Sequence, residues 1–297
     1  MGRYHAEKFA ARSDCKVVGV ADVDAERARA LAQKLGCPAF LDYQDTFRHA
    51  DAAVVSVPTE RHHAVAGACL EAGLHVLVEK PIAVDLAQSD ALIELARRKN
   101  KVLQVGHVER YNAAFRALAA RVQRPLLIDA ERLSGFKRRG ADVDVVLDLM
   151  IHDIDLCLAL AGSEVTDLSA CGFRVLTQEI DIATARIEFA DGCVANLSAS
   201  RVSQAPVRKL RVFQPGLYVS ADLQAGNLRS VGQAQGAIEE QEESHAGGDA
   251  LASQAEAFVK AIHGAAASGV DGEGGRRALA LALDVGRLVR ERLRRFG

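Results

Sequence analysis

The sequence predicts an α/β protein in which a parallel-sheet domain is followed by an α+β domain with a large, mainly antiparallel sheet. The first hundred residues alternate short, continuously apolar runs with amphipathic helical segments, which is the pattern of βαβ units. After Gly106 the apolar residues alternate with polar ones instead, as they do in strands that bury one face. We therefore expect one domain at residues 1–107 and a second at 108–297.

The elements of the first domain follow from its apolar runs and its helix-terminating residues. Asp24 can cap the helix that begins near Ala25, and Gly73 ends a later helix because glycine readily adopts the conformation that stops one. Four helices are expected: one at 3–11, one that begins near 25, one that ends at 73 and one at 86–98. The expected strands lie at 16–21, 52–57, 75–78 and 101–106. This order predicts a parallel sheet covered on both faces.

The second domain opens with a helix near 111–121 and a strand at 126–133, followed by a long helix near 144–160. Alternating segments at 167–175, 182–189, 193–200, 209–213 and 217–223 predict the antiparallel strands. Residues 233–248 are acidic, polar and contain glycine, which predicts a loop. Two helices, near 250–263 and 276–295, are expected to close the chain.

The composition disfavours several classes of protein. A hydrophobic content of 49% in 297 residues is sufficient for a core in each domain. The net charge of -2 disfavours binding to nucleic acid, and the longest apolar runs have strand length, so no membrane span is expected. The six cysteines are scattered without a C-x-x-C pair, and the N-terminus has no signal-peptide pattern. These features indicate reduced thiols in a cytoplasmic protein.

The beginning of the chain resembles a dinucleotide-binding Rossmann domain that lacks its first strand. Gly2 fits the third glycine of G-x-G-x-x-G, and Asp22 follows at the end of the next strand, where an acidic residue binds the ribose hydroxyls. In strand order 3-2-1-4-5-6 the missing strand is central, and each buried unpaired backbone group costs about 1–3 kcal/mol. We expect Met1 to be an internal methionine. The alternative is that Gly2 is an ordinary residue and the spacing to Asp22 is chance.

Four sequence motifs, taken together with their order and spacing along the chain, are specific for one family. They are Glu79-Lys80-Pro81 after a strand, Val57-Pro58-Thr59 followed by His62, the segment 104–112, and the segment 147–155. In this order they resemble the E-K-P, T-P-x-x-x-H, domain-crossover and D-x-G-x-H-x-x-D motifs of the Gfo/Idh/MocA family of oxidoreductases. Val57 stands where the family usually has threonine, and Met150 stands where it has glycine. The resemblance extends over nearly the whole chain.

Lys80 lies where a functional cation is expected. It follows a parallel strand, and ligands bind at the carboxyl ends of such strands. A positive charge there favours the alkoxide-like transition state of a reacting hydroxyl. The alternative is a solvated lysine in a surface turn, which is the usual environment of lysine.

The helix near 144–160 carries a polar stripe on an otherwise apolar surface. At about 100° per residue, Asp148, His152 and Asp155 lie within about 60° of one another. Ionisable groups on a buried helix are costly unless they are hydrogen-bonded or used in function. The alternative for His152 is a core histidine bonded by Asp148. Asp153 points away from the stripe and is expected to form a salt bridge or a cap elsewhere.

The family resemblance implies a role for each of these side chains. His152 would be the general base, Asp148 would orient it, and Lys80 would polarise the substrate hydroxyl. The implied cofactor is NAD, with NADP disfavoured because the Asp22 carboxylate repels a 2′-phosphate. The cofactor residues would be Gly2, Asp22, Pro58, His62, Glu79 and Lys80, and the substrate residues would be Arg110, Asn112, Lys137, Arg139 and Asp155. For Arg110 and Asn112 a structural role is an equal alternative.

The substrate implied by the resemblance is a nucleotide sugar. Segments 106–112 and 142–155 are most similar to family members that oxidise the 3-hydroxyl of UDP-N-acetylglucosamine. Lys137 and Arg139 would hold the diphosphate, unless they belong to a solvated basic loop. The alternatives are another sugar or a cyclitol, or a non-catalytic NAD-binding protein. A metal phosphohydrolase is suggested by His152-Asp153 but needs an all-α domain. The resemblance also implies a homodimer or homotetramer.

Overall fold

The computed structural model describes residues 1–136, 143–234, 236–265 and 269–296, and these fall into two compact units. The first unit contains Met1–Val108 and Ala250–Arg276, and the second contains Glu109–Asp249 and Arg277–Gly297. The first unit was expected to end at residue 107, and in the structure it ends at Val108. The grouping of 250–276 with the first unit was not expected, and it follows from the packing described below.

The first unit is built on parallel strands, as the sequence predicts. Within the described residues its strands are β1 (Val20–Ala21), β2 (Ala39–Phe40), β3 (Ala52–Val55), β4 (His75–Val78) and β5 (Leu103–Val105). β3, β4 and β5 pair in that order, and β1 pairs with β2 in a separate parallel sheet. The strand expected at 16–21 is thus reduced to two residues.

Local signals explain the helices of the first unit. The Asp24 side chain accepts hydrogen bonds from two backbone N–H groups of the next turn and so begins the helix at Ala25, as predicted. Phe9 and Phe258 meet edge to face at 6.3 Å, which packs the returning segment 250–276 onto the first helix. The helices of this unit are α1 (Gly2–Ala10), α2 (Ala25–Leu35), α3 (His62–Glu71), α4 (Leu86–Arg98) and α7 (Ala250–Ile262), with short 3₁₀ turns at Tyr43–His49 and Thr59–Arg61.

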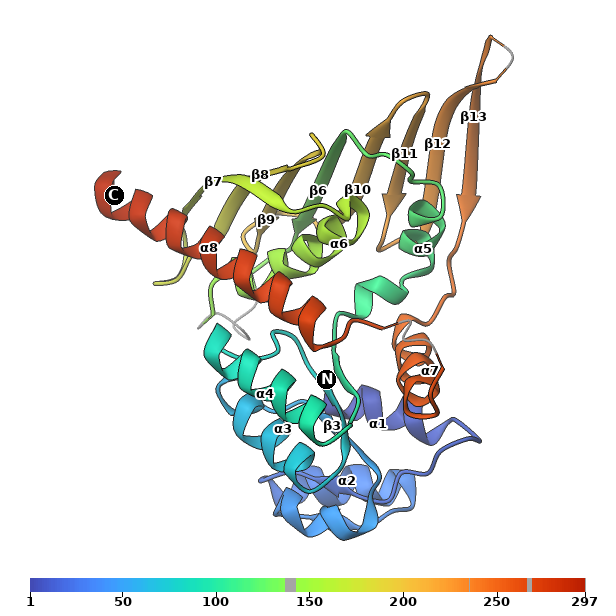
Figure 1. Ribbon diagram of the computed structural model, residues 1–297, viewed down its shortest axis with the longest axis vertical. Helices are drawn as coiled ribbons and strands as arrows, with labels where there is room; N and C mark the ends of the chain where they lie inside the picture. Colours follow the sequence, from blue (N-terminus) through green and yellow to red (C-terminus); the bar gives the residue numbers. More distant parts are fainter. Residues whose placement is uncertain (137–142, 235, 266–268, 297) are drawn as a thin grey trace. The chain divides into compact units, whose positions relative to one another are not determined.

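The second unit contains a large, mainly antiparallel sheet, which confirms the predicted fold class (Figure 1). Among the described residues it has eight strands in the order β13-β12-β11-β10-β6-β9-β8-β7, and only the β6–β9 pairing is parallel. The strands are β6 (Leu127–Leu133), β7 (Val165–Phe173), β8 (Ile182–Phe189), β9 (Val194–Ser200), β10 (Val207–Gln214), β11 (Leu217–Asp222), β12 (Asn227–Ala234) and β13 (Ala237–Ser244).

The prediction of a loop over 233–248 was wrong, because most of this segment is strand. β12 and β13 pair antiparallel from Asn227↔Ser244 to Ala234↔Ala237. Gly236, at a φ of 85°, lies in the turn between them. β13 is an edge strand with nearly every side chain exposed, so its acidic sequence has no buried face to produce an alternating pattern.

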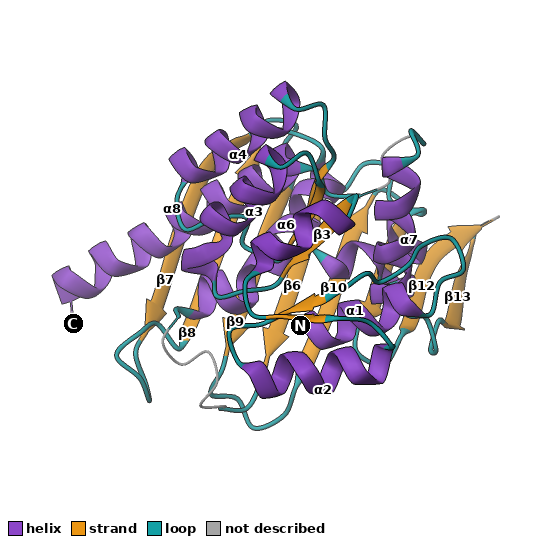
Figure 2. Ribbon diagram, turned by 90° about the horizontal axis from the view of Figure 1, so that it is seen from below, coloured by secondary structure: helices purple, strands orange, loops and turns teal. Residues whose placement is uncertain are grey.

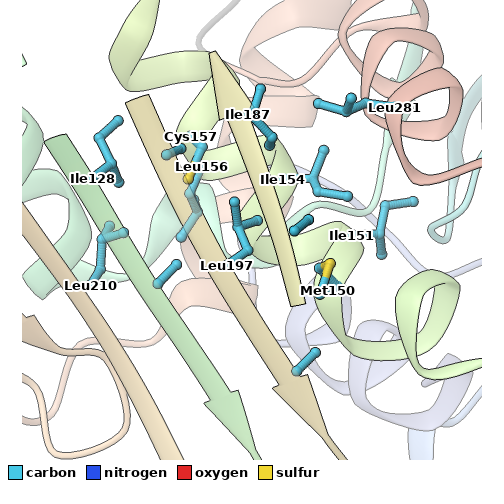
Figure 3. Packing of buried hydrophobic residues seen from close by; sticks show 14 of the residues in the cluster. Ile128, Met150, Ile151, Ile154, Leu156, Cys157, Ile187, Leu197, Leu210 and Leu281 are labelled. Carbon is cyan, nitrogen blue, oxygen red and sulfur yellow. The ribbon is translucent and has the colours of Figure 1, made fainter. Parts of the chain in front are cut away.

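Helices cover one face of this sheet and enclose the core of the unit (Figures 1 and 2). They are α5 (Ala113–Ala119), α6 (Ile151–Ala161) and the part of α8 (Gly272–Phe296) that begins at Arg277. A π-helical turn (Val146–Met150) precedes α6. Ile154 of α6 lies among sheet residues such as Ile187 and Leu197 and is fully buried (Figure 3). Each such side chain contributes about 1.5–3 kcal/mol on burial. None of the described helices is both long and apolar enough to cross a membrane.

The connection from β7 to β8 is organised by one buried carboxylate. Asp181 Oδ2 accepts hydrogen bonds from three consecutive backbone N–H groups, those of Val175, Leu176 and Thr177, at 2.7–2.9 Å. Thr177 Oγ1 donates to Asp181 Oδ1, and Arg201 lies 3.7 Å from the same oxygen. Burial alone would raise the pKa of Asp181, but the backbone and hydroxyl donors outweigh it and lower the pKa from 3.8 to about 2.

We expect the substitution Asp181→Asn to lower the free energy of unfolding at neutral pH by about 2 kcal/mol, which is the linkage value of that pKa difference. The contribution is present above the unfolded-state pKa of 3.8 and is lost as the pH falls toward about 2. Urea unfolding of both proteins between about pH 7 and about pH 3 measures it. Asp167→Asn, at an exposed position of β7, is the control. A difference that stays constant down to the lowest pH would contradict this account.

Candidate functional site

The carboxyl ends of β3 and β4 bring most of the predicted cofactor residues of the first unit together. Glu79 and Lys80 follow β4 directly, and Glu79 N donates to Val55 O of β3 at 2.9 Å. The beginning of α1 lies at the same place, since a Cβ on Gly2 would be 2.6 Å from Ser56 Oγ. A helix N-terminus with a glycine this close to a strand end is suited to hold a phosphate. Pro58 caps the short 3₁₀ turn that follows Ser56.

His62 lies at this edge but is buried beneath it. Its exposed fraction is 1%, with Nδ1 2.8 Å from Pro81 O and Nε2 3.0 Å from Val57 O. Burial lowers the pKa of His62, so the neutral ring predominates at neutral pH and donates to one of the two carbonyl groups at a time. The ring therefore braces the loop after β3 against the loop after β4. Its predicted contact with the cofactor stays a prediction.

Glu79 is held by the first helix. His5 Nε2 lies 2.6 Å from Glu79 Oε1, and the His5 side chain is almost fully buried. On the other side a Cβ on Gly106 would be 3.0 Å from Glu79 Cα, so this position needs glycine. The two contacts fix the backbone that carries Lys80, which is half-buried. His5 was not predicted, although it lies three residues after Gly2 and so on the same face of the helix.

Asp22 lies directly after β1, as expected for a residue that binds ribose hydroxyls. Its Oδ1 accepts a hydrogen bond from Asp24 N at 2.9 Å, and its side chain is 36% exposed. Arg27 Nη2 lies 3.5 Å from the same oxygen and is well exposed. The carboxylate is thus oriented by the backbone and keeps accessible acceptor capacity. Together with the N-terminus of α1, it fits the adenosine and phosphate groups of NAD.

In the second unit the predicted polar stripe lies on two kinds of helix. Asp148 belongs to the π-helical turn, whereas His152 and Asp155 belong to α6. A π-helical turn holds an extra residue, so the prediction of a regular α-helix over 144–160 was wrong in its first turn. Asp148 and His152 are half-exposed, while 153–157 are buried. The imidazole of His152 and the carboxylate of Asp148 are therefore less deeply buried than the side chains that follow them on the helix.

Two of the predicted substrate residues contact other parts of the protein. Arg110 donates to Asp155 in a bidentate pair, from Nε at 2.7 Å and Nη2 at 3.0 Å. Asn112 caps α5 through Oδ1, and its Nδ2 donates to Leu223 O at 2.8 Å. The geometry supports the structural alternative for Arg110 and Asn112, and their contact with substrate stays a prediction. Lys137 and Arg139 lie outside the described residues.

Asp153 forms a salt bridge, as expected, and its partner is Arg132. Arg132 of β6 donates to both Asp153 oxygens and also to Glu109. The sequence indicates that Arg132 is buried, because side chains alternate between the two faces of a strand. Ile128, Ala130 and Arg132 therefore all point toward the core. The first unit thus offers a lysine at a strand end, and the second offers an imidazole and a carboxylate on a helix. A cation and a base are the groups that ionise a hydroxyl.

Comparison with known proteins gives two family matches. Residues 1–107 match a family described as oxidoreductases with an NAD-binding Rossmann fold, and residues 112–214 match the GFO/IDH/MocA C-terminal domain. The UDP-N-acetylglucosamine 3-dehydrogenase of Acidithiobacillus ferrooxidans is 41% identical over 292 residues, 96% of this chain and 93% of that protein. The myo-inositol 2-dehydrogenase of Thermotoga maritima is 27% identical over 227 residues, 68% of this chain and 66% of that protein.

Solved structures of other proteins share the fold of this chain. That of the UDP-N-acetylglucosamine 3-dehydrogenase GnnA from Acidithiobacillus ferrooxidans matches with a TM-score of 0.91 at 40% identity, covering 97% of this chain and 93% of that chain. The scyllo-inositol dehydrogenase from Lactobacillus casei, with bound NAD(H) and scyllo-inositol, matches with a TM-score of 0.83 at 20% identity, covering 98% and 94%. At that identity the second likeness concerns the fold alone.

Proposed function

Because this chain belongs to the Gfo/Idh/MocA family of NAD-binding oxidoreductases, we propose that it oxidises the 3-hydroxyl of UDP-N-acetylglucosamine to a ketone. The chain is an NAD-dependent dehydrogenase. The substrate rests on one observation, the 41% identity with a UDP-N-acetylglucosamine 3-dehydrogenase along nearly the full length of both chains. The similarity to the inositol dehydrogenase of Thermotoga maritima is weaker and covers about two thirds of the chain.

The side chains divide the work of removing a proton and a hydride from one carbinol. NAD supplies the acceptor for the hydride that leaves the carbon. His152 takes the hydroxyl proton as general base, and Asp148 orients its ring. Lys80 stabilises the negative charge that develops on the oxygen. The half-exposed position of His152 on a buried helix and the place of Lys80 at a strand end support these roles.

The remaining binding residues are proposed from the charges that they carry. Asp22 favours NAD over NADP, since its carboxylate would repel a 2′-phosphate. Lys137 and Arg139 are proposed to bind the diphosphate of the nucleotide sugar, since guanidinium and ammonium groups suit phosphate oxygens. The phosphohydrolase alternative required an all-α domain, whereas the second unit is built on a sheet.

The test is the reduction of NAD with UDP-N-acetylglucosamine labelled with deuterium at C3, with the C4-labelled sugar as the matched control. The proposal expects deuterium on the reduced nicotinamide from the C3 label only. Myo-inositol and UDP-glucose test the alternative substrates. The chain should be assayed as printed above and with about 15 residues added before Met1 that supply a strand and a glycine-rich turn.

Each outcome of this assay is informative. Label transfer from C3 supports the proposal, in whichever form of the chain it occurs. Binding of NAD without turnover of the nucleotide sugar overturns the proposed substrate. Turnover of myo-inositol alone would then assign a cyclitol, and the absence of turnover with every substrate would favour a non-catalytic NAD-binding protein.

We also propose that the enzyme is a cytoplasmic homodimer or homotetramer. All six cysteines are free thiols, which supports a reducing compartment. The sheet face opposite the helices carries half-buried aromatic side chains such as Tyr218, whose ring lies 4.9 Å from that of Phe213, and this supports contact with another subunit. Light scattering of the purified protein measures the mass, and a monomer at micromolar concentration would contradict the proposal.

A further inference from the structure

A buried arginine lies beneath the helix that carries His152. Arg132 is 4% exposed and lies on the helix-covered face of β6, next to the apolar Ile128 and Ala130. Arginine is almost never buried to this degree unless its charge is paired, because its desolvation is costly. The neighbours of Arg132 therefore show what it is used for.

The Arg132 guanidinium joins two carboxylates from different elements. Nε and Nη2 donate to Asp153 of α6 at 3.0 and 2.8 Å, and Nη1 donates to Glu109 at 2.9 Å. Arg208 Nη1 donates to the same Glu109 oxygen at 3.3 Å and is half-exposed, so the network reaches solvent there. Burial alone would lower the pKa of Arg132, but Asp153 and Glu109 outweigh it and raise the pKa. The guanidinium is therefore charged.

A second arginine holds the other side of the same helix. Arg110, which follows Glu109 in the chain, makes its bidentate pair with Asp155. Along an α-helix, Asp153 lies about 100° from His152 in one direction and Asp155 about 60° in the other. His152 thus lies between two carboxylates that are each held by a planar, bidentate guanidinium. Such a pair fixes geometry as well as charge.

The two pairs together restrict rotation of α6 about its axis. An imidazole nitrogen lies roughly 6 Å from the axis, so a rotation of about 10° would move it by about 1 Å. A displacement of about 1 Å in a catalytic group can reduce a rate by about 10²-fold. Among the described side chains, Arg110, Arg132 and Arg208 face the carboxylates of Glu109, Asp153 and Asp155 in ion pairs. The network therefore acts on His152 through geometry.

We propose that Arg132, with Asp153 and Glu109, is a positioning network for His152. It fixes the rotation of α6 so that the imidazole meets the substrate hydroxyl, and it binds neither substrate nor cofactor. This inference rests on the proposed function, since it requires His152 to be the base. The residues that act through His152 are far apart in the sequence, and the structure places them in one buried cluster.

Two variants test the network. Asp153→Asn keeps the shape of the side chain and removes its charge. The double variant Arg132→Met with Asp153→Leu replaces the buried pair with apolar groups, which usually preserves folding, and Glu109 keeps its ion pair with Arg208. For both we expect kcat to fall by about 10- to 100-fold, with the KM for NAD unchanged. The deuterium isotope effect on kcat with C3-labelled sugar should rise, because a misplaced base slows the chemical step itself.

Two further variants control for general effects. Arg287→Met removes an exposed ion pair with Glu291 on α8 of the same unit. We expect it to retain wild-type kcat and isotope effect. Arg132→Lys keeps the charge but loses the planar bidentate contact, so its kcat should lie between those of the wild type and the double variant.

Other results would overturn the inference. If the double variant folds with wild-type kcat and isotope effect, the network has no role in positioning. If instead the KM for the sugar rises with kcat unchanged, the network binds substrate. Failure of the proposed function is distinguishable, because the wild-type protein itself would then leave UDP-N-acetylglucosamine unoxidised.

Discussion

Replacement of His152 with asparagine is expected to lower kcat for sugar oxidation by about 10³-fold and to leave the KM for NAD within about two-fold, because general base catalysis contributes about 10²–10⁴. Asparagine retains a polar side chain of similar size but cannot accept the hydroxyl proton. The wild-type rate should rise with pH as an imidazole base loses its proton, and the variant should lack this rise. Steady-state rates of NAD reduction across the pH range measure both effects.

The control for this substitution is His263→Asn. His263 is exposed in the turn after α7, so its loss should change neither kcat nor the pH profile. A His152 variant that keeps the wild-type pH dependence at a reduced rate would show that another group is the base. Wild-type activity in this variant would exclude His152 from the chemistry, and it would then be a packed helix residue.

Replacement of Lys80 with methionine is expected to lower kcat by about 10²–10³-fold, which is the typical effect of removing one group that stabilises a developing oxyanion. Methionine keeps most of the length of the side chain, and the contacts of Glu79 with His5 and Gly106 hold the adjacent backbone, so the strand end should be unchanged. Steady-state kinetics and binding of NAD to the variant measure the result.

Two comparisons interpret the Lys80 result. Lys34→Met removes an exposed lysine of the same unit, paired with Glu7, and should have no effect on kcat. Lys80→Arg keeps the charge but in a larger planar group, so we expect partial activity. A higher KM for the sugar with unchanged kcat in Lys80→Met would contradict the proposed role, because it would assign Lys80 to substrate binding in the ground state.

The sequence predicted those parts of the fold whose signals are local. The helix α2 begins at Ala25 because Asp24 caps it, and α4 (Leu86–Arg98) and β8 (Ile182–Phe189) have the predicted bounds. β13 was missed because it has no buried face. Its position is set by pairing with β12, which is a tertiary contact that no periodicity within the segment records.

The candidate site divides in the same way. The motifs placed Lys80 after a strand and His152 on a helix, since both positions follow from neighbours in the chain. The π-helical turn that holds Asp148 was not predictable from a regular period of 3.6 residues. The partner of Asp153 could not be found either, because Arg132 lies 21 residues away along the chain and meets it through the packing of α6 on the sheet.

The acidic edge strand β13 has a consequence for colloidal behaviour. An edge strand offers backbone groups to any strand that approaches, and negative charge is one means of preventing such aggregation. Glu240 and Glu243 each accept a hydrogen bond from an arginine, Arg229 and Arg121, which lowers the pKa of each carboxyl and preserves this repulsion in mild acid. The repulsion disappears once stronger acid protonates these carboxyls. Purification and storage in neutral or slightly alkaline buffer should therefore keep the protein dispersed, whereas acidic buffers should promote fibrillar or amorphous precipitation seeded at this edge.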